Sequence, residues 1–296
     1  MHIALLTTLA MLAFAGNSLL CRMALGSAEP IDPTSYTAVR LFSGAAVLAL
    51  LVALGRPRAE RYEHGSWRSA AWLFLYAIAC AYAYLSLDTG VGALILFGAV
   101  QATMIGAGLL SGERPRPLQW LGMAVAAAGL VYLLWPGVSA PSWQGALLMT
   151  GAGVAWGRYS LRGRGAKDPL ASTAANFLRA LPLAALLLVV MHDHLQLTPI
   201  GLLLAVLSGA VTSGIGYAVW YAAVRGLTAS AAAVVQLSAP VLATYAGVLW
   251  LDETLTARIV LSSVAILGGI ALVVRRGAAS AQAPAFAPAR GDSQRT

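Results

Sequence analysis

The residues best suited to bind a small molecule are uncharged polar side chains that interrupt long apolar stretches of this 296-residue chain. Polar groups are costly inside hydrocarbon, so they are usually turned toward a cavity or another helix. The amide and hydroxyl candidates for a binding site are Asn17, Gln101, Gln236 and Ser238. Such groups can bind the carboxylate and the ammonium group of an amino acid without carrying a net charge. The competing interpretation is that they hold helices together by hydrogen bonds.

Aromatic side chains form a second set of candidates for substrate binding. They are Tyr82, Trp156, Tyr159, Tyr217 and Trp220. Tyr217 and Trp220 share one helical face through their i, i+3 spacing. An aromatic wall would suit flat hydrophobic side chains and, through cation–π attraction, cations. The alternatives are core packing and the aromatic belt at a membrane interface.

Charged residues inside or at the ends of apolar stretches are candidates for gates. Arg40 and Arg179 lie within such stretches, whereas Glu113 and Glu253 stand at the ends of two others. The two arginines either bind a substrate carboxylate, form gating ion pairs (Arg40 with an outer acid, Arg179 with Glu113), or snorkel to the interface. None of the eleven Asp and Glu residues and none of the four His residues lies in the middle of an apolar stretch. We therefore expect facilitated diffusion or exchange rather than built-in proton coupling.

Several classes of function are disfavoured, and no catalytic residue, cofactor or metal site is predicted. An intramembrane enzyme would need a carboxylate pair, a His cluster or a nucleophile–base pair, and we find none in the apolar segments. The triplet at residues 192–194, His-Asp-His, falls in a loop without further ligands. The net charge of +8 is spread over short connections and lacks the basic face with stacking aromatics that binds nucleic acid.

The elements that must position these residues are membrane helices. The chain is 59% hydrophobic and 10% charged, whereas soluble domains contain about 25% charged residues, so we expect it to reside in a lipid bilayer. A spanning helix needs about 20 mostly apolar residues. Ten segments meet this requirement: 3–22, 34–54, 67–87, 91–110, 118–135, 142–161, 171–191, 200–224, 229–250 and 257–275. The first has no positively charged start, so we expect a retained helix rather than a signal peptide.

Two stretches of the chain are similar to each other, which indicates an internal duplication. Glu113 and Gly129 in the first stretch each precede their counterparts, Glu253 and Gly269, by 140 residues. Five helices per copy would place the second copy upside down, with a substrate site between the copies near the midplane. The predicted fold class is therefore an all-α integral membrane protein of ten transmembrane helices in two inverted five-helix repeats. The repeats are predicted at 1–137 and 138–276, followed by a disordered cytoplasmic tail at 277–296.

The distribution of basic residues predicts the orientation. With the N-terminus inside, 15 of the 19 Lys and Arg residues fall on the cytoplasmic side, as expected from the positive-inside rule. The chain is thus predicted to be a multi-pass protein of the inner (plasma) membrane with both termini in the cytoplasm. The internal symmetry and the paired polar residues argue against a purely structural or sensor protein.

Several short motifs occur in the same order as in a known family. Gly157 follows Trp156, Arg40 lies in the second segment, and Pro240 precedes Glu253 by thirteen residues. Residues 16–18 (Gly-Asn-Ser) and 112–114 (Gly-Glu-Arg) provide the matching elements in the first half, although Ala15 stands where a Trp would be expected. The sequence resembles the EamA-type ten-helix exporters of the drug/metabolite transporter superfamily. Within them it is most similar to the YddG-type exporters of aromatic amino acids and paraquat.

The resemblance implies an exporter of small hydrophobic or aromatic amino acids and related metabolites that works by alternating access. Alternative cargoes are other metabolites or cationic drugs. Exchange of nucleotide sugars or organophosphates is a further alternative, but these phosphates would need several basic groups in the cavity. The expected partners are a small-molecule substrate and the lipid bilayer, without nucleic acid. Substrate range, coupling and oligomeric state are left open by the sequence.

Overall fold

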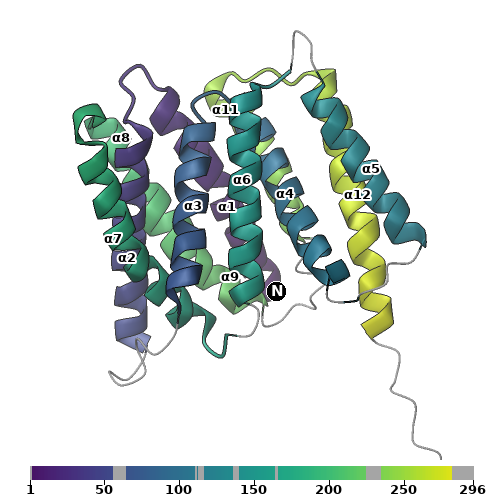
Figure 1. Ribbon diagram of the computed structural model, residues 1–296, viewed down its shortest axis with the longest axis horizontal. Coiled ribbons are helices and arrows are strands. Elements are labelled where there is room, and N and C mark those ends of the chain that lie inside the picture. The colour runs from purple at the N-terminus through teal and green to yellow at the C-terminus, as the bar shows by residue number, and fades with distance from the viewer. Residues whose placement is uncertain are drawn as a thin grey trace, which may run out of the picture.

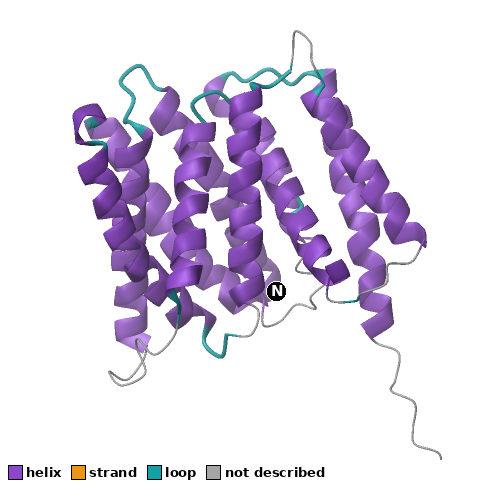
Figure 2. Cartoon of the chain, viewed as in Figure 1, coloured by secondary structure: helices purple, strands orange, loops and turns teal. Residues whose placement is uncertain are grey.

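The computed structural model describes residues 2–55, 65–110, 112, 117–135, 140–163, 166–224 and 235–281, and the described part consists of helices and loops without strands (Figure 2). The first-half helices are α1 (His2–Gly26), α2 (Pro33–Gly55), α3 (Trp67–Ala83), α4 (Thr89–Leu110) and α5 (Pro117–Leu134). The second half contains α6 (Trp143–Gly163), α7 (Pro169–Val190), a short 3-10 turn η2 (His192–His194), α8 (Pro199–Leu207), η3 (Ser208–Ile215), α9 (Gly216–Val224), α11 (Ser238–Leu251) and α12 (Ala257–Ala281).

Each of the ten predicted segments overlaps helical residues. Six helical stretches in the described part are long and apolar enough to cross a membrane, namely α1, α2, α4, α5, α7 and the continuous run from α8 to α9. Two shorter apolar helices lie at 238–251 and 257–272. The third segment ends at Ala83 rather than at residue 87, because Tyr84 caps α3 and a turn follows. Helix α12 continues to Ala281, past the point at which the tail was predicted to begin.

Side-chain caps explain where several helices begin. Asp32 Oδ1 accepts hydrogen bonds from the backbone N–H groups of Thr34 (2.8 Å) and Ser35 (2.9 Å) at the start of α2. Asp168 caps α7 in a similar way by accepting from the Ala171 N–H. In both helices a Pro follows the acid, and its fixed φ suits the first helical position. The acid–Pro pairs that the sequence contains therefore act as helix starts.

The helices form a main bundle with a separate pair at one edge. Helices α5 and α12 lie side by side at that edge (Figure 1) and reach the bundle through α4. Within the bundle, α2 packs on α7 and η3, α3 packs on α6, α4 packs on α6 and α11, and α1 packs on α9 and α11.

The eighth predicted segment contains a π-helical turn, η3, between α8 and α9. A π-turn widens the helix and is frequently found at functional sites. Gly209 lies where a Cβ would overlap the Ser43 hydroxyl and the backbone of Arg40 on α2, so only a glycine permits this approach. The turn thereby places the hydroxyl groups of Thr212 and Ser213 against the interior of the bundle, where both side chains are buried.

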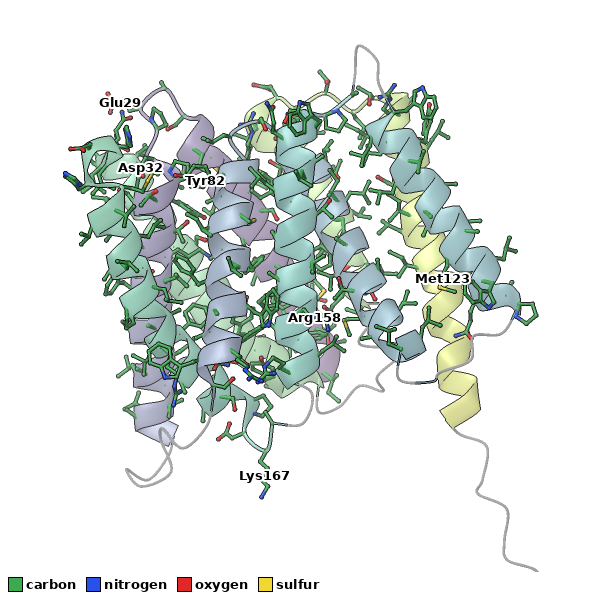
Figure 3. All side chains as sticks on the ribbon, in the orientation of Figure 1. Glu29, Asp32, Tyr82, Met123, Arg158 and Lys167 are labelled. Atoms are coloured by element: carbon green, nitrogen blue, oxygen red, sulfur yellow. The ribbon has the colours of Figure 1, made fainter. Side chains whose placement is uncertain are left out.

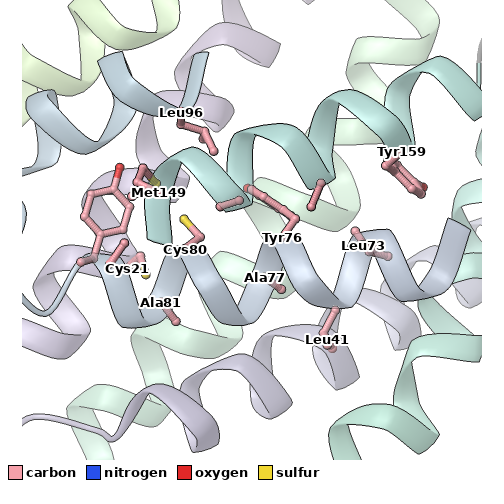
Figure 4. Packing of buried hydrophobic residues seen from close by; sticks show 14 of the residues in the cluster. Cys21, Leu41, Leu73, Tyr76, Ala77, Cys80, Ala81, Leu96, Met149 and Tyr159 are labelled. Atoms are coloured by element: carbon pink, nitrogen blue, oxygen red, sulfur yellow. The ribbon is translucent and has the colours of Figure 1, made fainter. Parts of the chain in front are cut away.

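The core of the bundle is assembled from small and aromatic residues around α3. Tyr76, Ala77 and Cys80 are buried there together with Leu96 of α4 and Met149 of α6 (Figure 4). Tyr76 lies between α3 and α6, with its hydroxyl in a network of polar groups. The core therefore contains a polar centre, which is the starting point for the site.

Candidate substrate cavity

A cavity of about 950 Å³ enters the bundle between α1, α3, α4, α6, α7 and α9. Its mouth is lined by Ser66, Arg162 and Pro169, at the end of the bundle that carries Lys167 (Figure 3). Six predicted residues line it: Gln101, Trp156, Tyr159, Tyr217, Trp220 and Gln236. Arg162, at the mouth, is the one charged side chain among the described residues that line it. The deep part of the cavity is therefore aromatic and neutral.

Trp156 is the centre of the aromatic lining. Its ring lies 5.3 Å from the ring of Tyr159 and 5.5 Å from that of Tyr217, both in stacked arrangements, and 4.8 Å from the tilted ring of Tyr76. Phe14 of α1 meets Tyr217 edge-on at 6.0 Å. Offset and edge-to-face contacts of this kind are the favoured geometries of aromatic pairs. A flat side chain entering the cavity would meet faces and edges that are already fixed.

A small recess of about 30 Å³ extends the cavity toward the polar centre of the bundle. The two share five lining residues, among them Trp156, Tyr217 and Gln236. Asn17 lies in the wall of the recess, and its Oδ1 accepts hydrogen bonds from Ser208 Oγ (2.8 Å) and Thr212 Oγ1 (3.2 Å). These contacts hold the Asn17 amide in one orientation.

Arg40 lies directly behind this recess and is 2% exposed. Its Nη2 donates to the hydroxyl oxygen of Tyr76 at 3.1 Å, and its Nε donates to Ser213 Oγ at 3.4 Å. Its guanidinium carbon lies 5.2 Å from the centre of the Tyr76 ring. Within the described residues no carboxylate forms a salt bridge with Arg40, so the predicted pairing with an outer acid is not formed here. The recess is therefore backed by a buried cation among neutral groups.

Polar contacts join distant segments of the chain at the opposite end of the bundle. The Glu253 carboxylate accepts from the Thr89 N–H (2.7 and 2.9 Å) and the Thr89 hydroxyl (2.8 Å) at the start of α4. Arg22 Nε lies 3.9 Å from the same carboxylate. The Tyr82 hydroxyl is 3.2 Å from Thr34 Oγ1 (Figure 3). Tyr82 thus joins α3 to α2 near this end and does not line the cavity.

Three further predicted residues have other placements. Ser238 donates to the Val235 carbonyl at 2.7 Å and does not line the cavity. Arg179 Nη1 donates to the Ala175 carbonyl at 3.2 Å on its own helix. Glu113 lies outside the described residues, and so does any ion pair between it and Arg179. In the described part of the chain, no group of three or more His, Cys, Asp or Glu side chains is placed to hold a metal ion.

The sequence interpretation missed several residues that form the site. Phe14, Thr212 and Ser213 line the cavity or its recess. Thr212 and Ser213 lie on the π-turn, where a run of Ser, Thr and Gly interrupts an otherwise apolar segment. That composition was the available signal. It did not identify a site, because small hydroxyl residues mark close helix packing as readily as a binding site.

Comparisons with known proteins bear on what this cavity does. Residues 143–275 match the model of the EamA-like transporter family. The chain is 58% identical to the uncharacterized protein PA1977 of Pseudomonas aeruginosa, over 91% of this chain and 93% of that protein. It is 30% identical to the threonine/homoserine exporter RhtA of Salmonella typhimurium, over 65% of this chain and 67% of that protein.

Two more distant similarities extend over most of the chain. The uncharacterized transporter YwfM of Bacillus subtilis is 28% identical over 77% of this chain and 79% of its own length. One crystal structure of another protein has the same fold, with a TM-score of 0.63 and 21% sequence identity over 92% of this chain and 96% of that one.

Proposed function

The chain belongs to the EamA-like transporter family, and from that premise we propose that it exports small hydrophobic and aromatic amino acids and related metabolites across the inner membrane. The observation that carries the proposal is the cavity, which is aromatic within, neutral in its depth, and closed at its far end. An aromatic amino acid is a zwitterion without net charge. Its binding site must therefore offer aromatic surface to the side chain and polar groups to the carboxylate and the ammonium group. Gln101 and Gln236 in the cavity lining and Asn17 in the recess would provide the polar groups.

The transport cycle we propose is alternating access between two inverted five-helix repeats. The contacts of the bundle support this: α2 packs on its counterpart α7, α4 on α11, and α5 on α12. The Tyr82–Thr34 contact between α3 and α2 is repeated in the second half by Tyr221 and Thr173, whose oxygens are 3.0 Å apart. Two halves with equivalent contacts can exchange conformations, which would open the site first on one side and then on the other.

The state described here would then be open to the cytoplasm and closed to the outside. The mouth of the cavity lies beside Arg162 and Lys167, and cytoplasmic connections are enriched in such residues. An exporter loads its substrate from this side. We further propose transport by facilitated diffusion or exchange, because the described residues that line the cavity include no carboxylate and no histidine.

The test is uptake of labelled phenylalanine, tryptophan, methionine and threonine by the full chain in liposomes, with and without a pH gradient. We expect saturable uptake that is insensitive to the gradient. Trp156→Ala should lower the affinity for phenylalanine about 10-fold, because each aromatic pair contributes about 0.5–1.5 kcal/mol beyond area burial and Trp156 is placed to offer the central face. Trp250→Ala is the matched control, since Trp250 is 63% exposed on α11 and remote from the cavity lining.

Each outcome of this experiment has a defined meaning. Gradient-driven uptake would contradict uncoupled transport but retain the amino-acid exporter. Equal effects of Trp156→Ala and Trp250→Ala would remove the aromatic wall from the binding site. Absence of saturable uptake for all four amino acids would refute the proposed substrate class.

A second candidate, export of small polar amino acids, is favoured by one finding. The relatives that are threonine/homoserine exporters are 30% identical to this chain. Their substrates share the carboxylate and ammonium ends but have small side chains. Threonine uptake that exceeds phenylalanine uptake, and that Trp156→Ala leaves unchanged, would support this candidate over aromatic substrates.

A further inference from the structure

The polar recess at the end of the cavity has unused capacity to donate hydrogen bonds. The Tyr76 hydroxyl oxygen accepts from Arg40 Nη2 (3.1 Å) and from Asn17 Nδ2 (3.4 Å), which occupies both of its acceptor positions. Its own hydrogen remains to be donated. Among the described residues none accepts it, and Tyr76 lines the recess.

Ser213 repeats this arrangement from the other wall. Its Oγ accepts from Arg40 Nε at 3.4 Å, so its hydrogen is also left to be donated. Ser213 lies on the π-turn and lines the same recess as Tyr76. One guanidinium therefore orients two hydroxyl groups as donors toward a single small space.

Arg40 itself lacks a compensating negative charge in the described part of the chain. Its Nη1 is buried and has no hydrogen-bond partner there. A buried, unpaired cation is costly, and the cost is offset when an anion binds close by. In surroundings of low polarity the attraction between such a charge and an anion is also much stronger than in water. Binding of a single negative charge in the recess would therefore lower the free energy of the protein.

We propose that the recess is a carboxylate subsite in which Tyr76 and Ser213 donate hydrogen bonds to the substrate, while Arg40 positions both hydroxyls and supplies the positive charge behind them. The inference rests on the proposed function, because the ligand enters through the transport cavity. It restricts the substrates to those with one carboxylate, and a side chain would then extend from the recess toward Trp156 and Trp220. Cations without a carboxylate are disfavoured by the same buried charge.

The experiment measures binding to the purified full-length protein by ligand-dependent thermal shift, with four probes of matched size. These are phenylalanine, its amide, 3-phenylpropionate (a carboxylate without an ammonium group) and phenethylamine (an ammonium group without a carboxylate). Threonine and its amide form a second pair. We expect each carboxylate to bind at least about 10-fold more tightly than its partner without one, as hydrogen bonds to a charged group predict.

The variants separate a role in binding from a role in folding. Tyr76→Phe and Ser213→Ala should each reduce the ratio of acid binding to amide binding by about 10-fold, while amide binding stays within about twofold. Arg40→Gln should reduce the same ratio of acid binding to amide binding, provided that this variant folds. If Arg40→Gln does not fold, Ser213→Ala still tests the subsite. Tyr245→Phe is the matched control, because it removes the same hydroxyl from a side chain that is 64% exposed. A general loss of stability would lower acid and amide binding together.

The possible failures can be told apart. Equal binding of phenylalanine and its amide, or an unchanged ratio in both Tyr76→Phe and Ser213→Ala, overturns the carboxylate subsite but leaves an amino-acid exporter. Binding of 3-phenylpropionate without any amino acid overturns the amino-acid exporter and supports the subsite. Preference for phenethylamine overturns the subsite, and binding of none of the probes overturns both.

Discussion

At the scale of single residues, Glu253 joins the end of α11 to the start of α4 at the end of the bundle away from the cavity mouth. Its carboxylate accepts three hydrogen bonds from Thr89 at the start of α4, where the helix dipole also favours a negative charge. We expect Glu253→Gln to weaken this contact by about 1–2 kcal/mol, because charge-assisted hydrogen bonds become neutral ones. The measurement is hydrogen–deuterium exchange of the first turn of α4, which should become faster. Asp193→Asn, an exposed acid on η2, should leave that exchange unchanged; equal protection in both variants would contradict a closing role.

The identities of the cavity residues were predictable from sequence to a limited extent, for a geometric reason. Tyr76 and Tyr82 are six positions apart on α3 and therefore lie on different faces, yet both occur in the same apolar background. A membrane helix is apolar on the cavity side and on the lipid side, so its pattern does not indicate which tyrosine faces inward. Trp156 and Tyr217 were candidates because they lie deep within their segments, but Tyr82 was a candidate for the same reason and does not line the cavity. Gln236 was a candidate because it and Gln101 lie in equivalent segments of the two halves. Ser238 was not distinguishable from them until its local contact to Val235 was known.

At the scale of elements, the π-turn η3 fixes how closely α8 and α9 approach α2. Gly209 is the contact point, and a methyl group there would overlap Ser43 and the Arg40 backbone. Gly209→Ala should therefore destabilise the protein by about 1–3 kcal/mol, as overpacking typically does. Gly268→Ala is the matched control: nothing lies within 4 Å of its added Cβ, and alanine favours a helix by about 0.5–1 kcal/mol. Thermal unfolding in detergent should show a lower midpoint for Gly209→Ala, and equal midpoints would contradict the tight contact.

The helices themselves were predictable because length and hydropathy suffice for a span. The acid–Pro starts at Asp32 and Asp168 also behaved as the sequence indicates, because both the cap and the proline act locally. The π-turn was not anticipated, since an apolar segment interrupted by Ser, Thr and Gly is compatible with a regular helix. Its geometry depends on contact with α2, and that contact arises only after the chain has folded.

At the scale of the whole molecule, the cavity, the buried Arg40 and the Glu253 contact suggest one transport cycle. A substrate that neutralises Arg40 would remove the cost of an uncompensated charge in the recess. In the proposed cycle, export would require the contacts of Glu253 and Tyr82 to break and equivalent contacts to form at the cavity mouth. Substrate binding would then lower the free energy of the loaded carrier, and two similar sets of end contacts would keep its two open states close in stability.

The orientation of this cycle is the last prediction, and it decides whether the carrier loads from the cytoplasm. The start of α1 and the end of α12 lie at the same end of the bundle as the end of α6 (Figure 1), where Arg162 and Gly163 line the cavity. Since Arg158 and Lys167 also lie toward that end (Figure 3), and cytoplasmic connections are enriched in basic residues, we expect reporters fused to the two termini to be active only in the cytoplasm. The measurement is a pair of fusions at each terminus, one to alkaline phosphatase, active outside, and one to green fluorescent protein, fluorescent inside. Phosphatase activity at one terminus alone would require an odd number of spans and would refute the inverted repeat. Activity at both termini would retain the repeat and reverse the side from which the cavity loads.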